Sequence, residues 1–156
     1  MTDIAAIMPQ AAVILPCSYG KVLMQLRDEK EGIVFPGQWG FFSGAVEPDE
    51  SPLQCAHREL HEELGFIVDE MYPLGVDTAD VPFAIKLHSF YCHLPCAVEK
   101  VVLQEGYDLG LFTLQEVNTQ QLYSPKAGRD FPVISHPIIF EIARRFFATL
   151  QEEGVK

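Results

Sequence analysis

One stretch of the chain, residues 44–66, restricts the fold more than any other because it places three glutamates at helical spacing. Glu59, Glu62 and Glu63 stand at positions i, i+3 and i+4, so on a helix they would share one face, within an arc of about 100°. Like charges at this spacing destabilise a helix by roughly 0.2–0.5 kcal/mol per pair. A divalent cation such as Mg²⁺, which prefers oxygen ligands, would remove this penalty. A solvated acidic face is the alternative, because most charge runs are solvated.

Capping residues mark both ends of the predicted helix. Ser51 can cap the N-terminus, Pro52 suits the first helical position, and Gln54 stands where a capping box has Glu or Gln. Gly65 suits the position just after the last helical residue. We expect an adjacent arc to face the core through its apolar residues, which are Leu53, Ala56, Leu60 and Leu64.

The residues around this helix resemble the Nudix box. Gly44 is followed by five residues, then Glu50, then seven residues, then RELHEELGF over residues 58–66. This spacing matches all of the box's fixed positions, within 23 of the 156 residues. The sequence FPGQWGFF over residues 35–42 also resembles the family's lead-in. The chain is therefore similar to Nudix hydrolases.

Two positions depart from the family's usual pattern. Ser43 stands where a second glycine is common, and Asp49 stands where the turn before the helix usually has glycine. Asp tolerates the left-handed conformation better than most residues, so the second change is mild. We expect Ser43 to affect the approach of a ligand rather than the fold.

The resemblance implies a metal-dependent active site. Glu59, Glu62 and Glu63 are the expected ligands of Mg²⁺ or Mn²⁺, with the carbonyl of Gly44 as a further ligand. The glutamate of Glu105-Gly106, which precedes a predicted strand, is expected to approach the metals; a surface loop glutamate is the alternative. Either Glu59 or Glu105 would act as the catalytic base, and the sequence does not choose between them.

Other residues are expected to hold the site or the substrate. By the resemblance, Glu50 and Arg58 keep the loop and the helix in place through charge-assisted hydrogen bonds. Arg27 ends a predicted strand and could bind a substrate phosphate, or it could be a surface arginine. Trp39 could stack on a nucleobase or pack under a loop. Ser43 directly precedes the box, and we expect it to contact the substrate.

The implied reaction is hydrolysis of a nucleoside diphosphate linked to another moiety X, with a nucleoside triphosphate as the leading substrate. Sugar nucleotides and ADP-ribose are alternatives; Pro82, 16 positions after Phe66, resembles ADP-ribose-cleaving relatives. Dinucleoside-polyphosphate relatives tend to have a tyrosine where this chain has Phe83 or Ala84. A non-catalytic nucleotide-binding module and an isoprenoid diphosphate isomerase are rivals of other classes. Modules without turnover are expected to lose box carboxylates, and the isomerase chemistry needs a proton-shuttling cysteine and a longer chain.

Length and charge set the remaining expectations. A chain of 156 residues that is 48% hydrophobic suits one domain, residues 1–156. A net charge of −11 argues against nucleic acid or an anionic membrane as the main partner. It is compatible with a small phosphorylated substrate if bound cations invert the local field. The N-terminus, MTDIAAIMPQ, has no basic segment typical of a signal peptide. We expect a cytoplasmic protein. A homodimer is compatible with these features.

The four cysteines are expected to be free thiols in a reducing compartment. They are Cys17, Cys55, Cys92 and Cys96. A zinc site at Cys92-His93-x-x-Cys96 would need a second ligand pair at a usual spacing, which the sequence lacks. Buried or strand-borne cysteine is the favoured interpretation.

The order of the predicted elements indicates an α/β (α+β) fold. Strands are expected at residues 11–15, 21–27, 40–46, 66–68, 71–76, 83–93 and 109–112. A short helix is expected at 114–117 after a Thr113 cap, and a terminal helix from Pro137 after a Ser135 cap. Residues 118–132 are expected to be loop-rich and to line the substrate entrance. Alternation of this kind gives a mixed sheet between helices, which the resemblance sharpens to a Nudix-type α/β/α sandwich.

Overall fold

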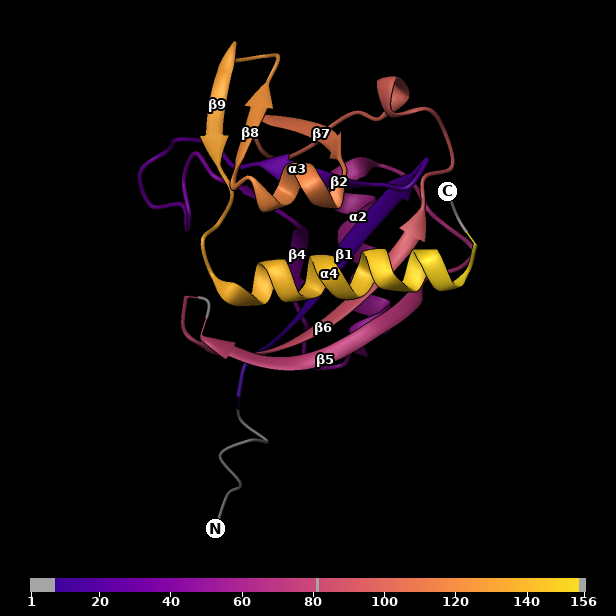
Figure 1. Ribbon diagram of the computed structural model, residues 1–156. Coiled ribbons are helices and arrows are strands. Elements are labelled where there is room, and N and C mark those ends of the chain that lie inside the picture. Colours follow the sequence, from indigo (N-terminus) through magenta and orange to yellow (C-terminus); the bar gives the residue numbers. More distant parts are fainter. Residues whose placement is uncertain (1–7, 81, 155–156) are drawn as a thin grey trace.

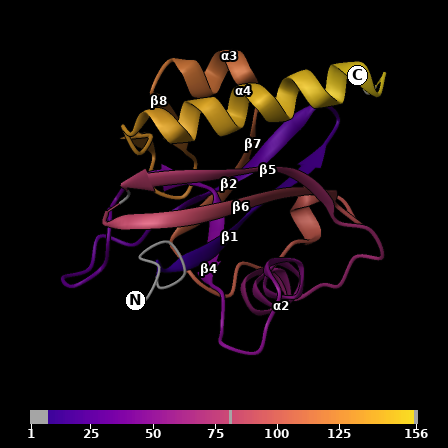
Figure 2. The same ribbon diagram turned by 90° about the horizontal axis from the view of Figure 1, so that it is seen from below.

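The structure, a computed structural model, describes residues 8–80 and 82–154 (Figure 1). Most of the N-terminal segment that bears on a signal peptide therefore lies outside the described residues, as does position 81. A mixed sheet forms the middle layer of the molecule. Seen from below, α2 (Pro52–Leu64) covers one face of this sheet, while α3 (Leu114–Asn118) and α4 (Pro137–Glu152) lie over the other (Figure 2). The expected α/β/α sandwich is confirmed.

The central sheet is seven-stranded, and a separate hairpin lies beside it. The sheet contains β1 (Gln10–Ser18), β2 (Lys21–Leu26), β3 (Trp39–Gly40), β4 (Phe42–Ala45), β5 (Tyr72–Asp80), β6 (Ala84–His93) and β7 (Asp108–Phe112). The hairpin consists of β8 (Gln121–Ser124) and β9 (Arg129–Pro132), and the 3₁₀ turn η1 (Val98–Lys100) precedes β7. No described helix combines the length and apolar character needed to cross a membrane.

The long strand β1 organises the sheet because it has different partners along its two edges. One edge pairs in parallel with β6 from Gln10 to Cys17. The other edge pairs antiparallel with β4 at residues 11–14 and with β2 at residues 17–18. As a result β4, which leads into the loop before α2, and β2, which ends just before Arg27, lie on the same side of β1. This arrangement places Arg27, which follows β2, on the same side of β1 as Gly44 of β4.

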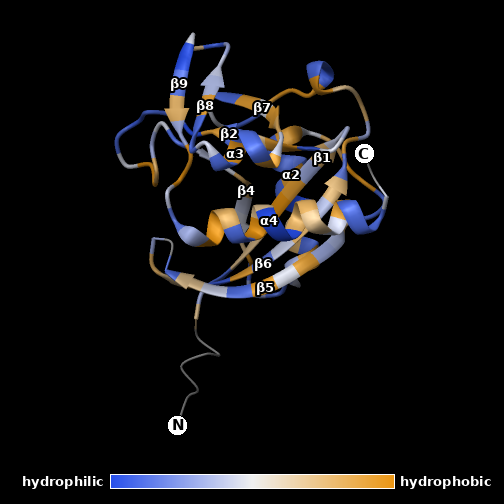
Figure 3. Ribbon diagram, in the orientation of Figure 1, coloured by the Kyte–Doolittle hydropathy of each residue, from blue (hydrophilic) through white to orange (hydrophobic). Residues whose placement is uncertain are grey.

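Two apolar clusters hold the layers together. Val13 and Leu15 of β1 contribute to the cluster beneath α4, and Ala12 and Ile14 to the cluster beneath α2. A strand buried on both faces has a continuous apolar sequence rather than an alternating one, as in the AAVIL run of β1. In Figure 3 the ribbon of α4 alternates between hydrophobic and hydrophilic segments, as expected of a helix with one face on the core.

Several predicted boundaries were wrong. β1 continues through Pro16 to Ser18, and β5 continues to Asp80 instead of ending at Val76. Residues 66–68 do not form a strand. The region expected to be loop-rich, residues 118–132, contains the hairpin β8–β9.

Two predicted helix details also differ from the structure. His136, rather than Ser135, caps α4, because its Nδ1 accepts a hydrogen bond from the backbone N–H of Ile138 at 3.1 Å. On α2, Leu53 is 43% exposed, and Cys55 is buried on the core side. The core-facing arc of α2 is therefore rotated slightly from the predicted one.

Candidate active site

Local capping fixes where α2 begins and ends. Ser51 Oγ accepts from the N–H of Gln54 at 3.1 Å, and Gln54 Oε1 accepts from the N–H of Ser51 at 2.8 Å. Gly65 ends the helix in the left-handed conformation, with φ of 75°. The predicted capping box and C-terminal glycine are confirmed. They set the register that decides where the three glutamates of α2 lie.

The three glutamates occupy different environments although they share one helix. Glu63 is only 5% exposed, and the side chain of Glu59 is 14% exposed. The side chain of Glu62 is 56% exposed and lies toward solvent. The structure therefore separates two partly enclosed carboxylates from one at the rim.

Gly44 lies directly against the carboxylate of Glu59. A Cβ built on Gly44 would lie 2.0 Å from Cδ of Glu59, so any side chain at this position would displace the carboxylate. The glycine of the box is thus required by the close approach of β4 to α2. Its carbonyl oxygen lies 3.5 Å from Sγ of Cys55.

Arg58 joins the loop before α2 to the helix. Its Nε donates to Glu50 Oε2 at 2.7 Å and its Nη2 to Glu50 Oε1 at 2.9 Å, a bidentate pair. The same Nη2 donates to the carbonyl of Ala45 at 3.1 Å. The hydrogen bonds that Arg58 donates to Glu50 lower the pKa of this carboxyl to about 2. The contacts support the positioning role expected for Glu50 and Arg58.

Arg58 also contacts two of the expected metal ligands. Its Nη1 donates to Glu59 Oε1 at 2.9 Å and to Glu62 at 3.3 Å. The guanidinium therefore relieves part of the repulsion that the sequence places on this face. Among residues 8–80 and 82–154, no three His, Cys, Asp or Glu side chains already enclose a metal position.

Glu63 lacks a comparable partner. Its Oε2 is buried without a hydrogen-bond partner, the only such side-chain atom in the described part of the chain. Burial, followed by the charges of Glu59 and Glu105, raises the pKa of Glu63 to about 8. Burial also raises the pKa of Glu59, against the opposing effect of Arg58. A buried carboxylate without a partner is costly, so the site is incomplete without a proton or a cation.

A polar pocket of about 400 Å³ gathers most of the predicted residues. The predicted residues along its wall are Arg27, Ser43, Gly44, Glu59, Glu63 and Glu105. Lys30 lies there as well. The carbonyl of Glu105 accepts from Gln25 Nε2 at 3.0 Å, and Gly106 has φ of 100° with no room for a Cβ beside Gln25. The structure thus supports the placement of Glu105 near the other carboxylates, although it is 41 residues beyond α2.

These residues fit a hard divalent cation. The pocket is lined by the carboxylates of Glu59, Glu63 and Glu105, which are a ligand type of Mg²⁺, and Glu63 has an unpaired oxygen among them. Glu59, Glu63 and the Gly44 carbonyl are the groups that would hold the ion. Glu62 would join only through movement from its exposed position beside Arg58.

Trp39 does not line this pocket, and the prediction that it binds substrate was wrong. Its side chain is fully buried, its Nε1 donates to the carbonyl of Leu122 at 3.0 Å, and its ring meets Phe112 edge to face at 5.0 Å. Its ring is therefore closed off from a nucleobase. The alternative interpretation, a tryptophan packed beneath a loop, is the correct one.

Three of the four cysteines are buried, as the favoured interpretation predicted, and Cys96 is not. Cys17, Cys55 and Cys92 are free and buried, and Cys96 is partly exposed. Burial raises the pKa of the Cys92 thiol to about 12, so this residue stays a neutral packing group at physiological pH.

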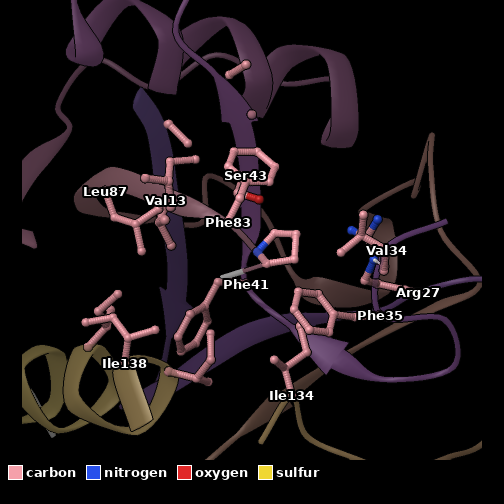
Figure 4. Close-up of a pocket in the computed structure, with 17 residues that line it drawn as sticks. Val13, Arg27, Val34, Phe35, Phe41, Ser43, Phe83, Leu87, Ile134 and Ile138 are labelled. Atoms are coloured by element: carbon pink, nitrogen blue, oxygen red, sulfur yellow. Dashed lines mark hydrogen bonds between the residues drawn. The ribbon is translucent and has the colours of Figure 1, made fainter. Parts of the chain in front are cut away.

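A second, apolar pocket lies beside the polar one and was not predicted from the sequence. It has a volume of about 310 Å³, and Figure 4 shows Phe35, Phe41 and Phe83 around it. Its walls come from segments that are far apart in the sequence, so only the folded chain reveals it.

Comparison with known proteins shows the family. The sequence matches the NUDIX domain family over residues 8–131. The chain therefore belongs to this family, as the box predicted.

The curated relatives share only part of their sequence with this chain. An RNA pyrophosphohydrolase of Xylella fastidiosa is 26% identical over 93 residues, which is 60% of this chain and 46% of the relative. An oxidized purine nucleoside triphosphate hydrolase of Danio rerio is 35% identical over 63 residues, 40% of this chain and 38% of the relative. The chain thus spans less than half of the length of these relatives. Among solved structures, the E. coli ORF135 protein has a TM-score of 0.68 at 24% identity and 97% coverage of both chains, which shows the same fold.

Proposed function

We propose that the chain hydrolyses a diphosphate linkage in nucleoside diphosphate derivatives with the help of Mg²⁺ or Mn²⁺. A nucleoside triphosphate is the leading substrate, and sugar nucleotides and ADP-ribose are the alternatives. Support comes from membership of the NUDIX family and from the names of the relatives, a pyrophosphohydrolase and a nucleoside triphosphate hydrolase.

The observation that carries the proposal is the unpaired, buried Oε2 of Glu63 in a pocket shared with Glu59 and Glu105. A protein that used this face only for solubility would leave the carboxylates in water. Burying one of them is unfavourable by itself and becomes favourable when a cation binds. This favours the metal site over the solvated acidic face.

The chain's own groups have distinct proposed roles. A bound divalent ion supplies charge neutralisation at the phosphate oxygens and lowers the pKa of a water molecule. Glu59 and Glu105 both face the pocket, and either carboxylate can accept a proton from the attacking water. Arg27, at the end of β2, would bind a phosphate, for which its guanidinium is suited. Arg58 and Glu50 keep the loop before α2 against the helix.

The partner that we propose is a small nucleotide rather than a nucleic acid or a membrane. The net charge of −11 disfavours long polyanions unless many cations intervene. Free, buried cysteines fit a reducing compartment such as the cytoplasm.

A substrate panel tests the proposal. Purified protein with millimolar Mg²⁺ is incubated with nucleoside triphosphates, sugar nucleotides and ADP-ribose, and the products are identified by mass spectrometry. Protein-free and EDTA-treated samples are the controls. We expect Mg²⁺-dependent cleavage between two phosphorus atoms in at least one class, with nucleoside triphosphates cleaved fastest. Intact substrates throughout the panel would contradict the proposed activity.

A further inference from the structure

The apolar pocket beside the carboxylates is large enough to hold part of a ligand. Its volume of about 310 Å³ lies at the lower end of the range of roughly 300–1,000 Å³ for small-molecule sites. Figure 4 shows side chains of β1, α4 and the loops before β4 and β6 directed into one hollow. The isoleucines on its α4 side are Ile138, Ile139 and Ile142.

This apolar pocket adjoins the polar pocket of the carboxylates. Arg27, Ser43 and Gly44 line both. A molecule whose phosphates lie beside Glu59 and Glu63 can therefore extend past Ser43 into the apolar pocket. The two pockets together describe a ligand with one anionic end and one apolar end.

The walls of the apolar pocket offer little to a hydrogen-bonding ligand. Among the described residues that line it, Arg27 and Ser43 carry the only polar side chains, and both lie at the junction with the polar pocket. The Nε of Arg27 is already engaged with the carbonyl of Val34 at 2.5 Å. A nucleobase has several polar edge atoms, and each one buried without a partner would reduce affinity about tenfold or more. A hydrocarbon group has no such atoms.

Phe35, which lines the apolar pocket, has an unfavourable backbone conformation. Phe35 has φ of 53°, which is a genuine outlier for a bulky residue. Such strain persists only where the surroundings enforce it, and it gathers at ligand sites. Here the strained residue is one of those that line the apolar pocket.

We propose that the pocket takes an apolar hydrocarbon group, so that, beside the nucleotides of the proposed function, the chain hydrolyses diphosphate monoesters of apolar alcohols and prefers them to nucleoside 5′-diphosphates. The inference rests on the proposed hydrolysis at the carboxylates. The oxygen of water bonds to the terminal phosphorus, the bond from that phosphorus to the bridging oxygen breaks, and the monophosphate ester leaves with the bridging oxygen. Inorganic phosphate is the second product, and the protons of the water pass to the products and buffer.

The test compares two diphosphates that differ only in the group attached. Geranyl diphosphate and guanosine 5′-diphosphate each release one phosphate, and their kcat/KM values are measured with Mg²⁺ while nucleoside triphosphate cleavage is followed in parallel. We expect kcat/KM to be at least about tenfold higher for geranyl diphosphate. Equal values, or a preference for the guanosine compound, would overturn the inference, and nucleoside triphosphate cleavage would still support the proposed function.

Binding of the products tests the pocket independently of turnover. Titration calorimetry with geranyl monophosphate and guanosine 5′-monophosphate is expected to show at least about tenfold tighter binding of the geranyl compound. If no diphosphate is hydrolysed, the proposed function fails, and this titration still decides whether the pocket prefers an apolar group. Equal affinities would overturn that preference.

A matched pair of variants places the binding in this pocket. Phe83 lines the pocket and is 53% exposed, while Tyr123 of β8 is 54% exposed and lies outside it. Phe83→Ala is expected to weaken geranyl monophosphate binding about fivefold or more through lost apolar contact, and Tyr123→Ala to leave it unchanged. An unchanged affinity in Phe83→Ala, or an equal loss in both variants, would contradict the assignment.

Discussion

At the scale of single residues, one helical step separates a carboxylate in solvent from one in the protein interior. Glu62 and Glu63 are neighbours of the same type, but Glu62 pairs with Arg58 near water while Glu63 is buried with an unpaired oxygen. The spacing of the glutamates was readable from the sequence. Which of them is buried depends on the exact angle at which α2 packs on the sheet, and this angle is a tertiary property.

The pH dependence of stability follows from the burial of Glu63. Its pKa is raised to about 8, so between about pH 4.5 and pH 8 the folded protein binds more protons than the unfolded chain. In EDTA, the free energy of unfolding is therefore expected to fall as pH rises through this window, by up to about 5 kcal/mol. Urea unfolding at pH 5, 6, 7 and 8 measures the slope.

Glu63→Gln is the control for this slope, because a glutamine keeps the shape and cannot ionise. The metal-free variant is expected to lose less stability than the wild type between pH 5 and pH 8. Parallel curves for the two proteins would show that the pH dependence comes from other groups.

At the scale of elements, Trp39 ties the short strand β3 to the hairpin β8–β9. Its Nε1 donates to Leu122 in β8. Trp39→Phe removes this donor and leaves both a buried carbonyl and a small void, so we expect a loss of about 2–4 kcal/mol of unfolding free energy. Since the ring does not face the polar pocket, KM is expected to stay within about twofold of the wild type.

Denaturant unfolding and steady-state kinetics on the same preparation check both expectations for Trp39→Phe. Tyr123→Phe, an exposed change on the same hairpin, is the control and is expected to alter stability by less than about 0.5 kcal/mol. A large rise in KM with normal stability would return Trp39 to the substrate site.

Elements with local signals were predictable, and elements that depend on tertiary pairing were less so. The boundaries of α2 follow from Ser51, Gln54 and Gly65, which act within a few residues. The hairpin β8–β9 has polar strands and was expected to be loop. Pro16 was expected to end β1, but it lies between the stretch paired with β4 and the stretch paired with β2, so the strand continues past it.

At the scale of the whole molecule, the excess of negative charge makes cation binding favourable in general, so a specific site must be separated from this background. A ligand that binds only the folded state adds RT ln(1 + [L]/Kd), which is about 1.4 kcal/mol at ten times Kd. We expect millimolar Mg²⁺ to raise the melting temperature of the wild type at an ionic strength matched with NaCl. Part of the gain comes from relieved repulsion at Glu59 and Glu63.

The double variant Glu59→Gln/Glu63→Gln tells the specific effect from the general one. Its melting temperature is expected to rise less with Mg²⁺ than that of the wild type. An equal rise in the two proteins would mean that the cation acts on the overall charge of −11.

The candidate site was largely predictable because the box specifies it as a contiguous motif. Glu105 was placed by a short Glu-Gly pattern, and the structure brings it to the same pocket as Glu59 and Glu63. The apolar pocket was not predictable, because Phe35, Phe83 and Ile139 come together only when α4 closes over the sheet. Motifs thus indicate the chemistry of this chain better than they indicate its substrate.

The most direct test of the proposed site is the effect of Glu63→Gln on turnover at saturating Mg²⁺, with the best substrate from the panel. Loss of a charged ligand is expected to lower kcat by on the order of 10²-fold or more, with an unchanged circular dichroism spectrum. A kcat near the wild-type value would contradict the central claim that the buried carboxylate of Glu63 holds the catalytic cation.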